Sequence, residues 1–198
     1  MEAGQAHPRK KSVDPFGGKD VLHGPLTLAR GLTPDIERQT CDALLNLGRS
    51  ADVVLLTCST LGPCITAESA NAPVPMIRVD GALAEEATRA GGKVIALCAV
   101  ETTLAPTARI FTDAAKRSGA EVEIRLVQDA WQLFRAGEHA VYLAKIAAAT
   151  EDAYQDGATI VALAQASMAG AAALLTQAMK PLTSPASGLI AAMNALRP

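Results

Sequence analysis

Aromatic residues are scarce in this 198-residue chain, at 3% of the sequence. Alanine, leucine and valine must therefore supply the core. Hydrophobic residues make up 49% and charged residues 19%, which is enough to pack a core and argues against a disordered chain. An excess of charge of one sign is also lacking, since the formal net charge is −2. This balance argues against a strongly basic nucleic-acid-binding protein.

Long apolar runs and cofactor motifs are missing too. No uninterrupted apolar run reaches the roughly 18 residues of a membrane helix, and no apolar segment follows the basic N-terminal stretch, as it would in a secretory signal. The four cysteines contain no C-x-x-C pair, which excludes a disulfide framework and a zinc ribbon. Neither GxxxxGK nor GxGxxG occurs, which weakens nucleotide-dependent functions. We expect a protein of the reducing cytoplasm without membrane or nucleic-acid partners.

Strands and helices are expected to alternate along the chain. Residues 1–20 are polar and rich in glycine, proline, lysine and aspartate, as in a flexible N-terminal arm. Thr33 is a candidate N-cap before Pro34, which predicts a helix as far as Arg49. Apolar runs predict strands, the fourth of them half-exposed, at 52–57, 75–79, 93–98, 121–127 and 159–164. Further helices are expected at 81–90, 104–118, 137–154, 168–179 and 188–196.

This alternation predicts an α/β fold with mainly parallel sheets and right-handed crossovers. Residues 53–60 and 160–167 resemble each other, because each is an apolar strand that leads into small and hydroxyl-bearing residues. Ligands of such folds bind at the carboxyl ends of the strands. Two similar lobes that face each other across one cleft would explain the repetition.

Cys58 is the clearest candidate for chemistry. It follows a predicted buried strand and precedes a predicted helix N-terminus, whose N–H groups and dipole favour a thiolate. The same groups can bind a carboxylate or a developing oxyanion, and Ser59 and Thr60 add hydroxyl donors. The alternative is that Cys58 packs as a small buried hydrophobe. The other cysteines are expected to pack in the core: Cys41, Cys64 and Cys98.

Polar residues also follow two other predicted strands. Thr102 and Thr103 either hold a carboxylate or cap the next helix. Gln165 can donate and accept hydrogen bonds, but it is not a proton-transfer base at neutral pH. Ser167 is either an N-cap or a ligand donor. The three histidines share no metal-ligand spacing with the cysteines.

Several motifs, taken in order, resemble the aspartate/glutamate/hydantoin racemase superfamily. The segments that carry the resemblance are LTCSTLGP at 56–63, RVD at 78–80, ETTLAPT at 101–107, LAQASMA at 163–169 and Ser184-Pro185. The combination and order of the motifs, more than any one of them, make the resemblance specific. TCSTLGP and AQASM indicate one branch of the superfamily.

The resemblance implies two pseudo-symmetric α/β lobes with the active site in the cleft between them. Residues 21–90 would form the first lobe, with a C-terminal helix at 185–198 packed back on it, and residues 91–184 the second. The family needs neither pyridoxal phosphate nor a metal, so no cofactor is expected. The expected partner is a small carboxylate, amino acid or hydantoin-like substrate. The resemblance is compatible with a homodimer, because homodimers are common in the family and Ala-rich helices can pack closely between subunits.

Family racemases use two cysteines on opposite faces of the substrate. Cys58 matches the first of them, and Gln165 stands where the second would be. The residues that match carboxylate-holding positions are Ser59, Thr60, Thr102, Thr103, Ala166 and Ser167. Loss of one positioned acid or base typically lowers a rate by about 10²–10⁴-fold.

Three functions follow from this resemblance. The first is a racemase or isomerase that moves a proton at a carbon next to a carboxylate or carbonyl. The second is a lyase of the arylmalonate decarboxylase type, in which one cysteine protonates one face. The third is a non-catalytic family member that binds a carboxylate.

Overall fold

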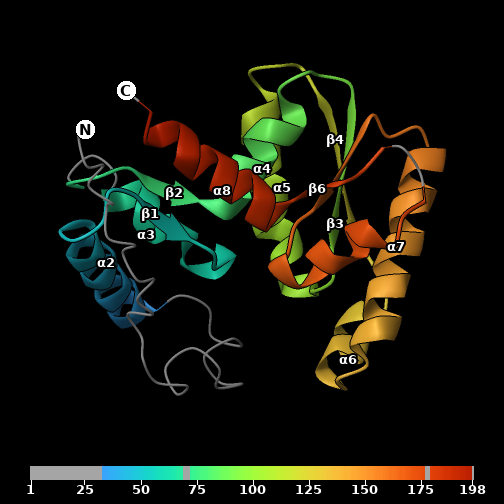
Figure 1. The fold of residues 1–198 in the computed structure, drawn as a ribbon, viewed down its shortest axis with the longest axis horizontal. Helices are drawn as coiled ribbons and strands as arrows, with labels where there is room; N and C mark the ends of the chain where they lie inside the picture. Colours follow the sequence, from blue (N-terminus) through green and yellow to red (C-terminus); the bar gives the residue numbers. More distant parts are fainter. Residues whose placement is uncertain (1–32, 69–71, 177–178, 198) are drawn as a thin grey trace, which may run out of the picture.

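The structure is a computed structural model that describes residues 33–68, 72–176 and 179–197. The predicted N-terminal arm, residues 1–20, lies outside these ranges. The described chain has an α/β fold with two parallel sheets, one of two strands and one of four (Figure 1). This confirms the predicted fold class.

The two-stranded sheet follows the first helix. Helix α2 (Pro34–Gly48) begins as predicted, because the Thr33 hydroxyl accepts a hydrogen bond from the Ile36 N–H at 3.4 Å. Strands β1 (Val54–Leu56) and β2 (Met76–Arg78) pair in parallel, so that Leu56 lies opposite Arg78. The short 3₁₀ helix η1 (Ser59–Leu61) and helix α3 (Gly62–Glu68) follow β1. The core under this sheet is built from Leu44, Val54, Cys64 and Ile65.

The larger sheet has the strand order β4-β3-β5-β6, and every pair is parallel. Its strands are β3 (Lys93–Cys98), β4 (Glu121–Leu126), β5 (Ile160–Leu163) and β6 (Leu182–Thr183). The five strand predictions were correct to within two residues at each end, and β6 was not predicted as a strand. A parallel sheet needs a crossover between its strands, and helices supply the crossovers here.

Helices cover both faces of the larger sheet. Val94 and Ala96 of β3 pack with residues of α4 (Val79–Thr88) and α5 (Leu104–Ala115). Ile95 and Leu97 point to the other face, where they pack with residues of α7 (His139–Gln155). Successive side chains of a strand point to opposite faces, which explains why β3 is fully buried from Val94 to Cys98.

Helix α8 (Ser184–Ala195) connects the two sheets. It follows β6 of the larger sheet and packs against α4, β1 and β2, as Figure 1 shows. The contact with α4 is close, since an ideal Cβ on Gly188 would lie 2.6 Å from Val79 Cγ1. Within the described ranges, no helix is long and apolar enough to cross a membrane.

Besides β6, three helices differ clearly from the prediction. The helix expected at 168–179 is the 3₁₀ helix η3 (Ala166–Ala173), which packs so closely on α7 that an ideal Cβ on Gly170 would lie 3.0 Å from Leu143 Cδ1. The short helix α6 (Ala130–Arg135) was not predicted, and it follows Asp129, which has a φ of 58°. The last helix begins at Ser184, four residues before the start expected from the residues alone and one before the start that the resemblance implies.

Candidate functional site

Three strand ends share one local geometry. After β1, β3 and β5 comes a residue in the extended conformation, and a 3₁₀ helix starts just beyond it. These extended residues are Cys58 (φ −96°, ψ 113°), Val100 (φ −120°, ψ 123°) and Gln165 (φ −110°, ψ 144°). The sequence similarity between the Cys58 and Gln165 segments is therefore matched by similar backbone structure.

Cys58 is exposed, whereas Cys41 is partly buried and Cys64 and Cys98 are buried. The alternative that Cys58 is a core residue is therefore wrong. Its carbonyl accepts from the Leu61 N–H at 3.2 Å, and within the described residues its thiol makes no capping hydrogen bond. An accessible thiol thus lies two residues beyond the end of strand β1.

Ser59 and Thr60 form the first part of η1. Ser59 is partly buried and Thr60 is exposed. Both follow Cys58 on a turn whose N–H groups point toward its start, as at any helix beginning. Two hydroxyl-bearing residues therefore come directly after the exposed thiol in the chain.

Arg78 supports this turn from the end of β2. Its Nε and Nη2 donate to the two carboxylate oxygens of Asp80 at 3.0 and 2.8 Å. The guanidinium lies over Gly62, since an ideal Cβ there would fall 2.1 Å from Arg78 Cζ. Asp80 Oδ1 also accepts from the Gly81 N–H at 2.8 Å. The sequence analysis missed this role of Arg78, although the arginine lies within the RVD motif.

Gln165 is held by hydrogen bonds on both sides of its amide. Its Oε1 accepts from the Ala99 N–H at 2.6 Å, and its Nε2 donates to Thr103 Oγ1 at 2.8 Å. The Thr103 hydroxyl in turn donates to the Val100 carbonyl at 2.6 Å. The ends of β3 and β5 are therefore joined through side chains as well as through their backbone pairing.

This network determines what each of its members can do. The Thr103 proton is already bound to a carbonyl, so the hydroxyl positions Gln165 and has no proton left for a ligand. The Gln165 amide also hydrogen-bonds with the Cys98 thiol behind it. Thr102 is exposed beside the network. The end of β5 thus offers a fixed amide and no acid or base at Gln165.

Cys98 lies behind this network, in the core as predicted. Its Sγ is 3.6 Å from Thr107 Oγ1. Burial raises the pKa of the Cys98 thiol, and hydrogen bonds with Thr107, Thr103 and Gln165 oppose the rise. Cys98 is therefore a neutral packing residue at ordinary pH.

Ser167 pairs with a residue that the sequence analysis did not identify. Its Oγ lies 2.9 Å from the hydroxyl of Tyr142 on α7. Tyr142 is only 1% exposed, whereas Ser167 and its neighbour Ala166 are exposed. Burial raises the pKa of Tyr142, and the hydrogen bond with Ser167 opposes the rise. A sequence-distant contact of this kind leaves no signal in the local pattern.

The candidate residues thus form two groups. Thr103 and Gln165 are in direct contact at the end of the larger sheet, with Ser167 two residues beyond Gln165. Cys58, Ser59 and Thr60 follow the smaller sheet. Among the described residues, no three His, Cys, Asp or Glu side chains lie where they could hold a metal ion.

Comparison with solved structures finds the same fold in racemases. A glutamate racemase isoform from Bacillus anthracis matches with a TM-score of 0.55 and 12% identity over 82% of this chain and 66% of that one. The chain thus spans slightly less than two-thirds of that racemase. An aspartate racemase homologue from Pyrococcus horikoshii OT3 matches with a TM-score of 0.54. The identity is 16% over 83% of this chain and 78% of that one.

A protein from Yersinia pestis, described as an Asp/Glu racemase, gives a TM-score of 0.60 and 16% identity over 82% of this chain and 75% of that one. Identities this low establish the fold alone. A search of curated protein sequences gives no match. The family model for Asp/Glu/hydantoin racemase matches residues 6–193, and the chain therefore belongs to this family.

Proposed function

We propose that the protein catalyses cofactor-independent proton transfer at a carbon next to a carboxylate or carbonyl, as a racemase or isomerase, with Cys58 as the acid/base. The observation that carries the proposal is the exposed thiol of Cys58 at the end of β1, followed by Ser59 and Thr60. As a thiolate, Cys58 would take the proton from the substrate carbon. The electron pair left behind would be delocalised into the adjacent carboxylate, which becomes an enediolate.

Donors around the thiol would stabilise that negative charge. Ser59 and Thr60 would hold one side of the carboxylate, and the N–H groups of the η1 turn would add to them. From the other sheet we propose Thr102, Ala166 and Ser167, with Ala166 contributing through its backbone. Thr103 would act indirectly, because its proton is bound to Val100 and its oxygen holds Gln165.

This proposal requires the two groups of residues to face each other. We propose a cleft between two lobes, the first containing β1, β2 and α8 and the second containing the larger sheet. The packing of α8 against both β1 and β2 supports this division. A small carboxylic acid, amino acid or hydantoin would bind in the cleft.

A one-sided reaction is the second candidate, and the hydrogen bonds of Gln165 favour it. Both ends of that amide are bound, and an amide does not transfer protons at neutral pH. In a decarboxylation, the bond between the substrate carbon and a carboxyl group breaks and carbon dioxide leaves. The electron pair forms an enediolate, and the Cys58 thiol then gives its proton to the carbon. Only one acid is needed for this sequence.

Proton NMR in deuterium oxide tests the proposal with a panel of amino acids, hydantoins and substituted malonates. Exchange of the α-hydrogen that yields both enantiomers would identify a racemase, and loss of carbon dioxide with a single enantiomer would identify a lyase. Cys58→Ala should abolish either reaction while the circular dichroism spectrum is unchanged. Cys41→Ala, which replaces a partly buried thiol on α2, serves as the matched control and should keep the activity.

Activity that survives in Cys58→Ala would contradict the thiol mechanism. If no member of the panel reacts but some raise the melting temperature, the protein is a carboxylate-binding member of the family and the proposed catalysis is wrong. Ligand that binds only the folded state raises stability by mass action, so binding is detected without turnover.

A further inference from the structure

We propose that Tyr142 is a positioning residue: its buried hydroxyl donates to Ser167 and thereby directs the Ser167 proton toward a bound carboxylate. The inference rests on the proposed function, because it assigns a role within the same site. The observations that carry it are the 2.9 Å distance between the two hydroxyl oxygens and the contrast in their exposure.

Within the described part of the chain, the hydroxyl of Tyr142 forms one hydrogen bond, with Ser167. The ring projects from α7 into the core and packs against Phe134, with the ring centroids 5.3 Å apart. Its hydroxyl lies against that of Ser167, which is exposed at the start of η3. Among the described residues, the one buried side-chain oxygen or nitrogen without a partner is Ser187 Oγ, so the Tyr142 hydroxyl is satisfied.

The direction of this hydrogen bond follows from burial. If Ser167 donated, the phenol proton would be buried without an acceptor, which is an unfavourable state. Burial also raises the pKa of Tyr142, so the phenol keeps its proton at neutral pH. Tyr142 is therefore the donor and Ser167 the acceptor. The exposed Ser167 retains its own proton for water or for a ligand.

Gln165, two residues away, is fixed by its own hydrogen bonds. Its Oε1 accepts from the Ala99 N–H, and its Nε2 donates to Thr103 and lies beside the Cys98 thiol. The hydroxyl proton that the end of β5 offers to a ligand is therefore that of Ser167. Such an arrangement suits a negatively charged oxygen group, which accepts hydrogen bonds, better than an amide or ammonium group of similar size.

The experiment compares malonate with malonamide, which has the same carbon chain but amide groups in place of carboxylates. Binding of each is measured by titration calorimetry with the wild-type chain. We expect Tyr142→Phe to weaken malonate binding about tenfold, a typical size for a charge-assisted hydrogen bond. We expect its malonamide affinity to stay within about twofold, as for contacts that carry no charge. The ratio of the two affinities is thus the readout, and a general loss of packing would not change it.

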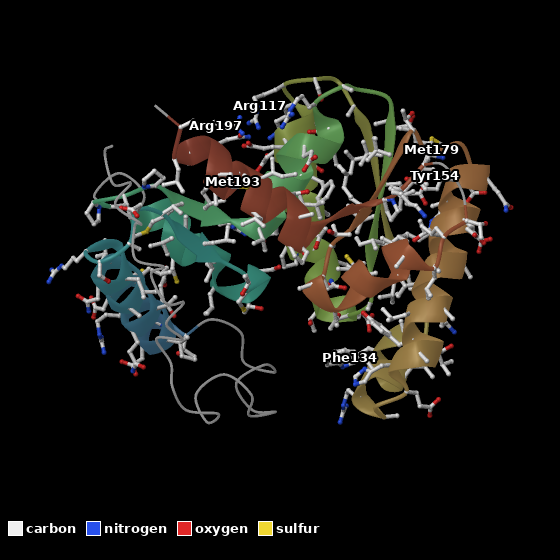
Figure 2. All side chains as sticks on the ribbon, in the orientation of Figure 1. Arg117, Phe134, Tyr154, Met179, Met193 and Arg197 are labelled. Carbon is white, nitrogen blue, oxygen red and sulfur yellow. The ribbon has the colours of Figure 1, made fainter. Side chains whose placement is uncertain are left out.

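Tyr154→Phe is the matched control. Tyr154 is the other tyrosine of the sequence and also lies on α7. Figure 2 shows Tyr154 near the end of α7 that is far from Phe134, the residue against which Tyr142 packs. This variant should leave both affinities unchanged. Ser167→Ala should lower malonate affinity as much as Tyr142→Phe does, and the double variant should lose no more than either single one, because the two side chains act as one unit.

Three results would overturn the proposal: equal losses for malonate and malonamide, losses that add in the double variant, and no malonate binding by the wild type. If Tyr142→Phe folds poorly, the affinity ratio of Ser167→Ala still tests the proposal, because equal losses of malonate and malonamide binding would contradict a Ser167 proton directed at a carboxylate. None of these measurements needs turnover. Failure of the proposed catalysis is recognised separately, by the absence of Cys58-dependent proton exchange.

Discussion

The guanidinium of Arg78 lies directly on Gly62. An ideal Cβ at Gly62 would come within 2.1 Å of both Arg78 Cζ and Arg78 Nη2. Gly62 is the first residue of α3, four residues after Cys58, and Arg78 ends the neighbouring strand. Because Gly62 has no side chain, Arg78 can pack against the turn that follows Cys58 while it stays paired with Asp80.

Gly62→Ala should therefore displace Arg78 and break its two hydrogen bonds with Asp80. The far end of Arg78 can move, so the cost is that of the lost ion pair, about 1 kcal/mol, and urea denaturation at pH 7 measures it. Gly81→Ala is the matched control, because its Cβ would meet nothing closer than Arg78 Cβ at 3.6 Å. An alanine in that helix should be neutral or stabilising by up to about 1 kcal/mol. Equal effects of the two variants would show that Arg78 does not depend on Gly62.

The exposure of the four cysteines predicts the order of their alkylation. At pH 8, iodoacetamide should label Cys58 first, since it is the exposed one. Cys64 and Cys98 are buried, and burial raises the pKa of both thiols, that of Cys64 to about 11. Their thiolates are therefore scarce at pH 8. Peptide mass spectrometry after short exposure gives the order, and rapid labelling that persists in Cys58→Ala would contradict it.

The raised pKa of the buried Cys64 thiol predicts that the folded chain loses stability at alkaline pH. Burial, followed by the influence of Cys41, raises its pKa from 9.0 to about 11 in the folded chain. Between these values the unfolded chain releases the proton and the folded chain holds it. The contribution of Cys64 to the free energy of unfolding is therefore fully present below pH 9. It falls by about 2 kcal/mol as the pH rises to 11.

The measurement is the free energy of unfolding at pH 8 and pH 11 for the wild type and Cys64→Ala. The variant starts lower, because it leaves a small cavity in the core under the first sheet. Its further loss between the two pH values should be smaller than that of the wild type by the contribution of Cys64. Identical losses would show that the Cys64 thiol does not control the effect.

Gln165→Cys tests the missing second acid/base. The variant should gain or increase racemisation of whichever substrate the NMR panel identifies. It should also lose about 1–2 kcal/mol of stability, because the Ala99 N–H and the Thr103 hydroxyl each lose a partner. Chiral chromatography measures the first effect and urea denaturation the second. Unchanged racemisation in a folded variant would place the second base elsewhere.

Much of the architecture was predictable because its signals are local. The apolar run at 93–98 predicted β3 at its observed ends, and Thr33 with Pro34 predicted the start of α2. The helix expected at 168–179 was wrong in type and extent, because alanine favours an α-helix locally while close packing on α7 accompanies the 3₁₀ form.

The candidate site was predictable only in part. Cys58 and Gln165 were found because each follows a recognisable strand. Tyr142 is 25 residues from Ser167, and Arg78 is 16 positions after Gly62 in the sequence. Such long-range contacts follow no sequence period, so only the folded chain reveals that these two residues support the site.

The position of α8 has a consequence for how the protein is made. A sheet of two three-residue strands is not stable alone, and here its packing is completed by a helix encoded at residues 184–195. During synthesis, the segment that carries Cys58 leaves the ribosome more than a hundred residues before that helix. At about 5–20 residues per second this delay lasts for several seconds or more. We therefore expect the thiol segment to be translated early, to stay open to chaperones and oxidants in the meantime, and to be among the last parts to fold.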